Sequence, residues 1–562
     1  MTVDEDRVAA WILVKRWRVY AVLALLALAL LGPGTATLPL IDRDEPRFAG
    51  ATREMMTKGE WVVPYFNGEF RFDKPILIYW LMRISIGVFG DGEWAVRFPS
   101  IVFAAATAWV IYEWGRGLGR AGAGALGGAI WLSSFQVLIH GRLAVADMPM
   151  VFFVALAQLA LWQLISDSAG RGRFWFWILW ISLGLGFLAK GPIALAVPLG
   201  SALIWRWVFW RQSAHWKRLR PGLGLLVMLG VMSVWGIPAL VATGGLFWKV
   251  GMGEHVIARG TEAFNERSFV LFYYLLTAPL SLLPWFGFAG YALGGLRQCW
   301  SSSVAFLAAW AVTPYLVFFA YSTQLPHYVM PGFPAFALLA GMGIIRLWES
   351  GCASRWANGW FWMFGFVVPL IVMIMGVTFM TLAQGEQEPE LAWTFMGFAG
   401  AMVGLICFSM AARFRIGGVA LVGLVILAVC QSIIGKKLGG FVPSASLENQ
   451  GGGLARGYQE PSLVYYGGPV WTWRDEAEPW SDFLQAAREQ PVAVALIQER
   501  RLEDWAGDVL PSLVRVRNRP PLLPEGWEAE AKEAGFKVER RTGVNTARVS
   551  WVEVGILRPS QR

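Results

Sequence analysis

The sequence predicts a polytopic α-helical membrane protein that ends in a small α/β domain. Of its 562 residues, 56% are hydrophobic and 15% are charged, and the mean hydropathy is +0.48. Soluble proteins carry about a quarter charged residues, so this composition indicates that lipid is the main solvent. About thirteen apolar segments approach the roughly 20 residues that a membrane-spanning helix needs. Beyond residue 453 the composition changes to that of a soluble domain.

The predicted spans follow one another over the first 434 residues. The first has no convincing cleavage site, so we expect a retained helix rather than a cleaved signal peptide. The predicted spans are 20–38, 94–112, 121–139, 149–165, 174–189, 192–210, 222–241, 269–296, 304–321, 328–345, 360–382, 393–410 and 417–434.

Basic residues in short loops predict the orientation of these helices. Lys15, Arg16 and Arg18 precede the first span, and such residues favour the cytoplasmic side. With about thirteen spans, the other basic loops fall on that same side. The outer side then receives the first loop (41–93), the turn at Asp147, Lys190, the central loop (244–268), the turn 322–327 and the whole C-terminus.

These patterns divide the chain into a transmembrane domain (1–438), a linker rich in Gly and Ser (439–453) and an outer soluble domain (454–562). In the soluble part, segments 463–466, 492–497 and 551–556 have the composition of strands. Segment 481–489 is expected to be a helix with Ser481 as its N-cap.

Charge and cysteine usage exclude several classes of protein. The net charge is +9, but the basic residues are scattered singly, which is typical of topology signals and contacts to anionic lipid rather than of a nucleic-acid site. No pair of the four cysteines has the spacing of a disulfide framework or a zinc site. No internal repeat is evident, which weighs against transporters built from duplicated halves.

The first outer loop carries most of the residues that could do chemistry. Asp44 and Glu45 precede Pro46 at the start of an expected interfacial helix, where acidic residues commonly cap or favour the helix N-terminus. The same position suits a carboxylate that deprotonates or aligns an acceptor hydroxyl. Asp73 and Lys74 precede a second short apolar helix (76–89), where the lysine either binds a lipid phosphate or extends toward lipid headgroups.

Further candidates lie at other outer turns. Asp147 either caps the helix that Pro149 opens or belongs to a site, and Lys190 is either a topological anchor or a ligand. His255 follows Glu254, a pair that is weak evidence for a divalent metal. The following candidates are distant in sequence yet fall on one face, which predicts a shared outer cavity: Asp44, Asp147, Lys190, His255 and Tyr328.

Several motifs resemble one known family, the bacterial lipid A aminoarabinose transferases and the related protein O-mannosyltransferases, which share the GT-C membrane glycosyltransferase fold. The resemblance is strongest in the first 200 residues. It rests on Asp44-Glu45-Pro46-Arg47-Phe48, Arg53-Glu54-Met55, Trp61-Val62-Val63-Pro64, Asn67-Gly68, Asp73-Lys74-Pro75, Tyr79-Trp80, Gly141-Arg142-Leu143, Asp147-Met148-Pro149, Lys190-Gly191-Pro192, Glu254-His255 with Arg259, Gln324-Leu325-Pro326-His327-Tyr328-Val329-Met330-Pro331 and Pro461-Ser462-Leu463-Val464-Tyr465-Tyr466.

The resemblance implies an inverting transferase of the bacterial inner membrane that takes a sugar from undecaprenyl phosphate. By that likeness, Asp44, Glu45 and Asp147 are the catalytic carboxylates, and Lys74, Arg47 and Tyr328 bind the donor phosphate. Asp73, Lys190, His255 and Arg259 are further candidates for the site. Two departures put the donor in doubt: Gln324 stands where the family usually has Lys, and Asp73 where it often has Glu.

The implied partners are an undecaprenyl phosphate sugar, membrane lipids and a periplasmic acceptor such as lipid A, another envelope glycan or a protein. No nucleic acid and no resident metal are expected, although a divalent cation stays open. The rival function is a transporter or flippase for a lipid-linked sugar, and a third alternative is a docking protein for envelope synthesis. A pump would place ionisable residues near mid-span, whereas these carboxylates fall at helix ends.

Overall fold

The structure, a computed structural model, describes most of the chain. The described residues are 15–166, 171–209, 215–251, 253, 272–296, 300–319, 321, 323–351, 354–383, 389–438, 442–447, 449–501, 522–545 and 550–560.

Within these described ranges, nine helices are long and apolar enough to cross a membrane. Each coincides with a predicted span, so the chain is a multi-span helical membrane protein. The main helices of these spans are α5 (Glu93–Gly117), α8 (Asp147–Ile165), α9 (Gly172–Lys190), α11 (Pro221–Ala242), α16 (Ser302–Phe319), α17 (Phe333–Ser350, continuing η6, Pro326–Gly332), α19 (Val368–Ala383, continuing α18, Arg355–Trp362, and η7, Met363–Val367), α20 (Pro389–Phe414) and α21 (Gly417–Leu438).

The other four predicted spans take shorter or bent forms. The predicted span 269–296 contains two helices bent by 102°, α14 (Tyr273–Ser281) and the η5–α15 unit (Trp285–Phe288 and Ala289–Leu296). The span 121–139 is interrupted at Ser133, between α6 (Ala121–Leu132) and α7 (Phe135–His140). The remaining two are α2 (Arg16–Leu31) and α10 with η1 (Ile193–Ile204 and Trp205–Phe209), which are shorter than the nine.

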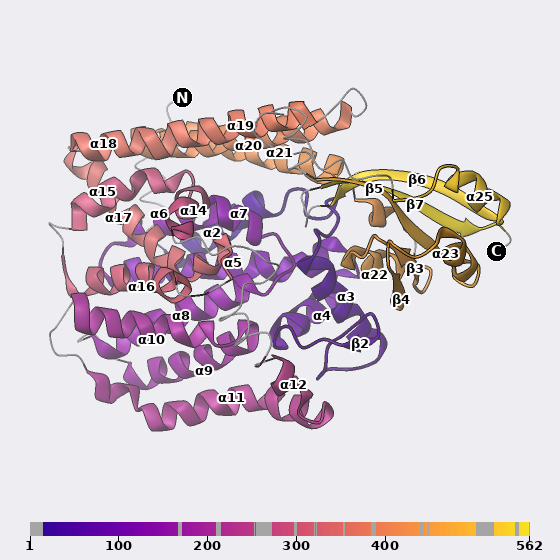
Figure 1. Cartoon of the computed structure of the whole chain (residues 1–562). Coiled ribbons are helices and arrows are strands. Elements are labelled where there is room, and N and C mark those ends of the chain that lie inside the picture. The colour runs from indigo at the N-terminus through magenta and orange to yellow at the C-terminus, as the bar shows by residue number, and fades with distance from the viewer. Residues whose placement is uncertain are drawn as a thin grey trace.

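The helices are arranged in layers around two central elements. In α8 and in the η6–α17 span, 78% and 83% of the apolar window is buried, whereas the figure is 17% for α11 and for α21. Figure 1 shows α11 at one edge of the bundle and α19, α20 and α21 at the opposite edge. Since a membrane helix needs no polar face, these outer helices can expose leucine and valine to lipid.

The first loop folds into two helices and a small hairpin at one end of the bundle. Helix α3 (Asp44–Thr57) begins where the sequence predicts, with both acidic residues and Pro46 in its first turn. Strands β1 (Tyr65–Phe66) and β2 (Glu69–Phe70) pair antiparallel, and α4 (Leu77–Phe89) follows. Figure 1 shows this loop between the bundle and the C-terminal sheet.

The C-terminal residues form a mixed sheet of five strands in the order β4-β3-β5-β7-β6. Both faces are covered, because alternate residues of β5 pack in different clusters: Ala493 and Ala495 in one, and Val494 and Leu496 in the other. The elements are β3 (Gly453–Arg456), α22 (Pro461–Gly467), β4 (Trp471–Arg474), α23 (Trp480–Ala487), β5 (Ala493–Arg501), α25 (Trp527–Glu533), β6 (Phe536–Asn545) and β7 (Ser550–Pro559).

Two local predictions in this part are wrong. Segment 463–466 lies in helix α22 and not in a strand, because Pro461 opens a helix there and Gly468, at φ +93°, ends it. The N-cap of α23 is Pro479 and not Ser481, whose hydroxyl instead bonds the Asp482 carboxylate. The strands predicted at 492–497 and 551–556 are confirmed in β5 and β7.

Candidate functional site

A buried ion pair holds the first turn of α3 against the membrane helices. Arg97 on α5 donates to both carboxylate oxygens of Glu45, at 2.8 and 2.7 Å, and neither side chain is more than 1% exposed. The same carboxylate accepts the backbone N–H groups of Ile41 (2.9 Å) and Ala144 (2.7 Å). Because each oxygen already has two donors, the geometry supports a positioning role for Glu45 rather than contact with a substrate.

Asp44, the first residue of α3, differs sharply from its neighbour. Its side chain is exposed, and it makes no hydrogen bond or ion pair with any residue the structure describes. It interacts electrostatically with Arg47, Arg71 and His140. The helix therefore presents one open carboxylate within electrostatic reach of these basic groups, which is the arrangement that an acceptor-binding group needs.

Two arginines lie close to Asp44. Arg71 is buried and is engaged by the Asp73 carboxylate at 2.8 Å and the Tyr79 hydroxyl at 3.1 Å. Arg47 is partly buried and, within the described ranges, forms neither a hydrogen bond nor an ion pair. Burial and the charge of Arg71 lower the pKa of the Arg47 guanidinium. A cation in this position is stabilised by an incoming anion.

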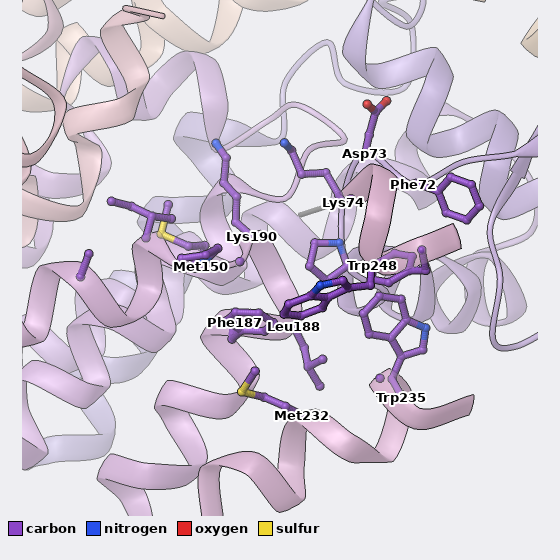
Figure 2. Close-up of a pocket in the computed structure, with 18 of the residues that line it drawn as sticks. Phe72, Asp73, Lys74, Met150, Phe187, Leu188, Lys190, Met232, Trp235 and Trp248 are labelled. Atoms are coloured by element: carbon purple, nitrogen blue, oxygen red, sulfur yellow. The ribbon is translucent and has the colours of Figure 1, made fainter. Parts of the chain in front are cut away.

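A pocket of about 530 Å³ lies beside these groups, between the first loop and α9, α10 and α11. Figure 2 shows Lys74 and Lys190 extending in the same direction at one end of it, while apolar side chains such as Phe187, Met232 and Trp248 line the rest. Tyr328 and Asp73 also line its wall. The pocket can therefore take an apolar ligand with an anionic end.

Asp147 lies behind the lysine end of the pocket. It is the first residue of α8, is buried, and accepts from the Lys190 ammonium at 2.5 Å, whereas its side chain does not cap the helix. The Lys190 ammonium also lies 5.5 Å from the centre of the Tyr328 ring. Three candidates from distant parts of the sequence thus meet at one point, although Asp147 is already paired with a cation.

Two histidines join this cluster, and neither is assigned a role by the sequence analysis. The rings of His140 and His327 lie 4.6 Å apart, and His327 Nε2 is 4.0 Å from Asp147 Oδ1. Burial lowers the pKa of His140. The chain has four histidines, so their concentration here is a feature of the site.

Helix α22, which lies between strands β3 and β4 in the chain, docks on the first loop. Asp42 accepts the backbone N–H of Ser462 at 2.9 Å and its hydroxyl at 2.7 Å. The Tyr466 hydroxyl donates to Glu93 (3.0 Å) and accepts the Leu40 N–H (3.0 Å). Burial raises the pKa of Asp42 to about 7, although the bonds from Ser462 act in the opposite direction.

Further along the same interface, Arg53 donates to the Tyr465 carbonyl (2.6 Å) and lies over the Tyr465 ring. Asn67 exchanges two hydrogen bonds with the backbone of Trp471, at 2.9 and 2.6 Å. The C-terminal sheet and α22 are thus bound to both the helix and the hairpin of the loop that carries Asp44.

Glu254, His255 and Arg259 lie outside the described residues, so the structure places none of them. Across the described ranges, no three His, Cys, Asp or Glu side chains are grouped as metal ligands.

Comparisons with known proteins agree with this architecture. Residues 73–237 match the family model described as dolichyl-phosphate-mannose-protein mannosyltransferase. The undecaprenyl phosphate-alpha-4-amino-4-deoxy-L-arabinose arabinosyl transferase of Edwardsiella ictaluri is 32% identical over 60% of this chain and 61% of its own length. The protein of the same name from Pseudomonas paraeruginosa is 33% identical over 56% of this chain and 58% of its own length. The chain therefore matches about three fifths of these relatives.

The match to a solved structure is more extensive. ArnT from Cupriavidus metallidurans, crystallised with undecaprenyl phosphate, superposes with a TM-score of 0.70 over 95% of this chain and 97% of that one, at 19% identity. The chain has the ArnT fold. Both findings confirm the resemblance to this glycosyltransferase family that the sequence motifs indicate.

Proposed function

We propose that the chain is an inverting glycosyltransferase that moves a sugar from undecaprenyl phosphate to a periplasmic acceptor. The observation that carries this proposal is the mainly apolar pocket with Lys74 and Lys190 at one end. Its apolar lining suits a polyprenyl tail, and its two lysines suit a terminal phosphate. The names of the relatives support the same donor, since they are transferases of an undecaprenyl phosphate sugar.

The donor phosphate would lie between the two lysines, with Arg47 and the Tyr328 hydroxyl as further ligands. As the bond from the anomeric carbon to the phosphate oxygen breaks, negative charge develops on the phosphate. Fixed cations stabilise that charge in a site that excludes water. Lys74 contributes here as a ligand of the leaving group, and Asp73 holds Arg71 in place from the same loop.

The acceptor would approach past Asp44, the open carboxylate of α3. Its oxygen attacks the anomeric carbon from the face opposite the phosphate, which inverts the configuration. If the acceptor is a hydroxyl, Asp44 takes up its proton. If the acceptor is a phosphate, as on lipid A, no proton needs removal and Asp44 mainly orients the acceptor.

The structure and the comparisons give no support to the flippase alternative. Asp44 and Asp147 are each the first residue of a helix and not mid-span groups. The relatives are named as transferases.

The topology that accompanies this proposal has about thirteen spans, counting the shorter and bent helices, since about 20 residues are needed only for a full perpendicular crossing. The N-terminus would be cytoplasmic, and the site and the C-terminal domain would face the periplasm of a bacterial inner membrane. The division into residues 1–438, 439–453 and 454–562 belongs to the same proposal. For His255 the proposal is a structural or acceptor-side role rather than a metal site.

The donor is tested by mass spectrometry of the lipids that co-purify in mild detergent. We expect the wild type to retain undecaprenyl phosphate or its sugar conjugate, and Lys74→Ala to lose it. Lys58→Ala is the matched control, because Lys58 is exposed on the same loop and lies over the Tyr65 ring away from the pocket. If no polyprenyl species is enriched with the wild type, the proposed donor is wrong.

The acceptor class is tested with two variants in a transfer assay. If the acceptor is a phosphate, Lys74→Ala abolishes transfer, whereas Asp44→Asn retains most of it. If the acceptor is a hydroxyl, both variants lose transfer. Full activity in both would exclude this site altogether.

A further inference from the structure

A continuous row of buried polar side chains runs from α14 toward the donor pocket. The Ser281 hydroxyl donates to the Gln136 carbonyl oxygen at 3.2 Å, which leaves the amide nitrogen of Gln136 to donate to His140 Nδ1 at 2.9 Å. The neutral form of His140 therefore carries its proton on Nε2. Ser281 and Gln136 are both buried, so the His140 ring is held in one orientation.

The row continues through His327 to the pocket wall. The His327 ring packs on the His140 ring, with centroids 4.6 Å apart and planes inclined by 34°. On its other side, His327 Nε2 lies 4.0 Å from Asp147 Oδ1, the same oxygen that accepts from Lys190. Asp147 thus lies between the Lys190 ammonium group, which borders the pocket, and the His327 ring, which does not line it.

Binding of a lipid phosphate would disturb this arrangement. Lys190 borders the pocket, so a phosphate at the lysine end competes with Asp147 for the same ammonium group. Asp147 is buried, and an ionised carboxylate that loses its partner in a buried place is strongly destabilised. A second cation next to Asp147 would remove this penalty, and His327 is the group in position to become that cation.

We propose that His327 is a positioning residue for the donor: it takes up one proton from solvent as the lipid phosphate binds, and its imidazolium then holds Asp147 while Lys190 turns to the phosphate. This inference rests on the proposed function, since it assumes that an anionic lipid occupies the pocket. No covalent bond changes in this step.

The charged groups around His327 set the direction of the effect. Asp147 on α8 favours the imidazolium, whereas Lys190 on α9, Lys74 before α4 and His140 on α7 favour the neutral ring. In the free protein, burial is the largest effect that keeps the ring neutral, and together with His140 and the two lysines it outweighs the Asp147 carboxylate, which is already paired with Lys190. When an anion offsets the lysines, the balance moves toward the charged ring, so the bound state holds one more proton than the free state.

This linkage fixes the sign of the pH dependence. Because the bound state holds the extra proton, the affinity for the lipid phosphate rises as the pH falls, by at most tenfold per pH unit over the range where His327 is neutral in the free protein and charged in the complex. If His327 had only a structural role, its substitution would change the affinity for the lipid phosphate by the same factor at every pH.

The test measures binding of undecaprenyl phosphate in detergent from pH 5.5 to 8.5, through the fluorescence of Trp235 and Trp248 in the pocket wall. It compares the wild type with His327→Gln and with His215→Gln, an exposed histidine outside the pocket. A phosphate monoester itself titrates near pH 6. That contribution is common to all three proteins, so the difference between their slopes belongs to the histidine. We expect His215→Gln to show the same pH dependence of affinity as the wild type. For His327→Gln, the slope of log affinity against pH should be smaller by up to one.

Calorimetry of the wild type makes the test independent of any variant that fails to fold. Binding at pH 7.5 is measured in two buffers that differ in ionisation enthalpy, which counts protons directly. Net uptake supports the inference, because the lipid phosphate alone could only release protons on meeting two lysines. Zero uptake, or equal slopes for the wild type and His327→Gln, overturns it. If the wild type binds no undecaprenyl phosphate at any pH, the proposed donor is also wrong.

Discussion

Removal of the Arg97 guanidinium should be the most damaging single change to the scaffold of the site. The Arg97→Met variant keeps much of the side-chain volume but leaves the Glu45 carboxylate buried without its cation. It also removes hydrogen bonds from Arg97 to the carbonyls of Thr35, Leu38 and Pro39. The first turn of α3 and the segment before it would lose their common anchor.

The magnitude follows from the burial of the pair. Breaking a fully buried ion pair by deleting one partner costs about 3–5 kcal/mol, chiefly because the other charge is left uncompensated. The double variant Arg97→Met/Glu45→Gln removes that charge as well, so we expect it to recover part of the loss. The natural control is Arg116→Met, because Arg116 pairs with Glu113 at 2.6 Å on the same helix but is 34% exposed. Exposed pairs contribute about 0–1 kcal/mol.

Unfolding by titration with SDS in mixed micelles, followed by tryptophan fluorescence, gives the difference in unfolding free energy. A loss for Arg97→Met no larger than that for Arg116→Met would refute the anchoring role. A double variant as unstable as the single one would show that the lost carbonyl contacts, and not the stranded carboxylate, dominate. Transfer activity should fall with Arg97→Met even at temperatures where the protein stays folded, because Asp44 follows the displaced turn.

Three further changes test other parts of the site. In the folded protein the Asp42 carboxyl has a pKa of about 7, above the roughly 4 of an unfolded chain, so protonation stabilises the folded form and this contribution is lost as the pH rises from 4 to 7. The unfolding temperature of Asp42→Asn should therefore drop less between pH 5 and pH 8 than that of the wild type. Equal drops would contradict this. Gly191 has φ +79° and ψ −151°, a region of backbone conformation open essentially to glycine. Gly191→Ala should therefore destabilise the protein by about 1–3 kcal/mol and, by moving the adjacent Lys190, weaken the binding of undecaprenyl phosphate. The control Gly222→Ala, inside α11, should change neither the stability nor the binding. Asn67→Ala removes both hydrogen bonds to the backbone of Trp471. Since each bond contributes about 1 kcal/mol, amide hydrogen exchange at the edge of the sheet should become roughly tenfold faster or more. Unchanged exchange would mean that the hairpin does not hold the sheet.

The positions of the long helices could be predicted from the lengths of the apolar segments and from the basic residues in the loops between them. Apolar length and the bias of lysine and arginine depend on the solvent rather than on packing, so the nine long helices could be located from the sequence. The same count placed Lys190, Asp147 and Tyr328 on one face, and the structure brings them together. The helix at Asp44 was also predictable, because its acidic first turn and Pro46 are local signals.

Features that depend on pairing between distant residues were not predicted. Arg97 lies inside a predicted span, and a charge in such a segment indicates a specific partner, which could have directed attention to Glu45. No sequence pattern links His140 with His327, since their contact arises from two turns that meet only in the folded bundle. Helix α22 was misassigned because Tyr465 and its neighbours favour strands, whereas Pro461 and Gly468 set the start and end of a helix there.

The contact between Asp42 and Ser462 joins residues 420 positions apart in the chain. During synthesis the first loop is therefore complete long before the segment that braces it has been made. A growing or truncated chain would carry every residue of the donor pocket while α3 still lacked its brace. Under the proposed function, the site would therefore reach its braced form only after the last span has been inserted and the C-terminal sheet has folded.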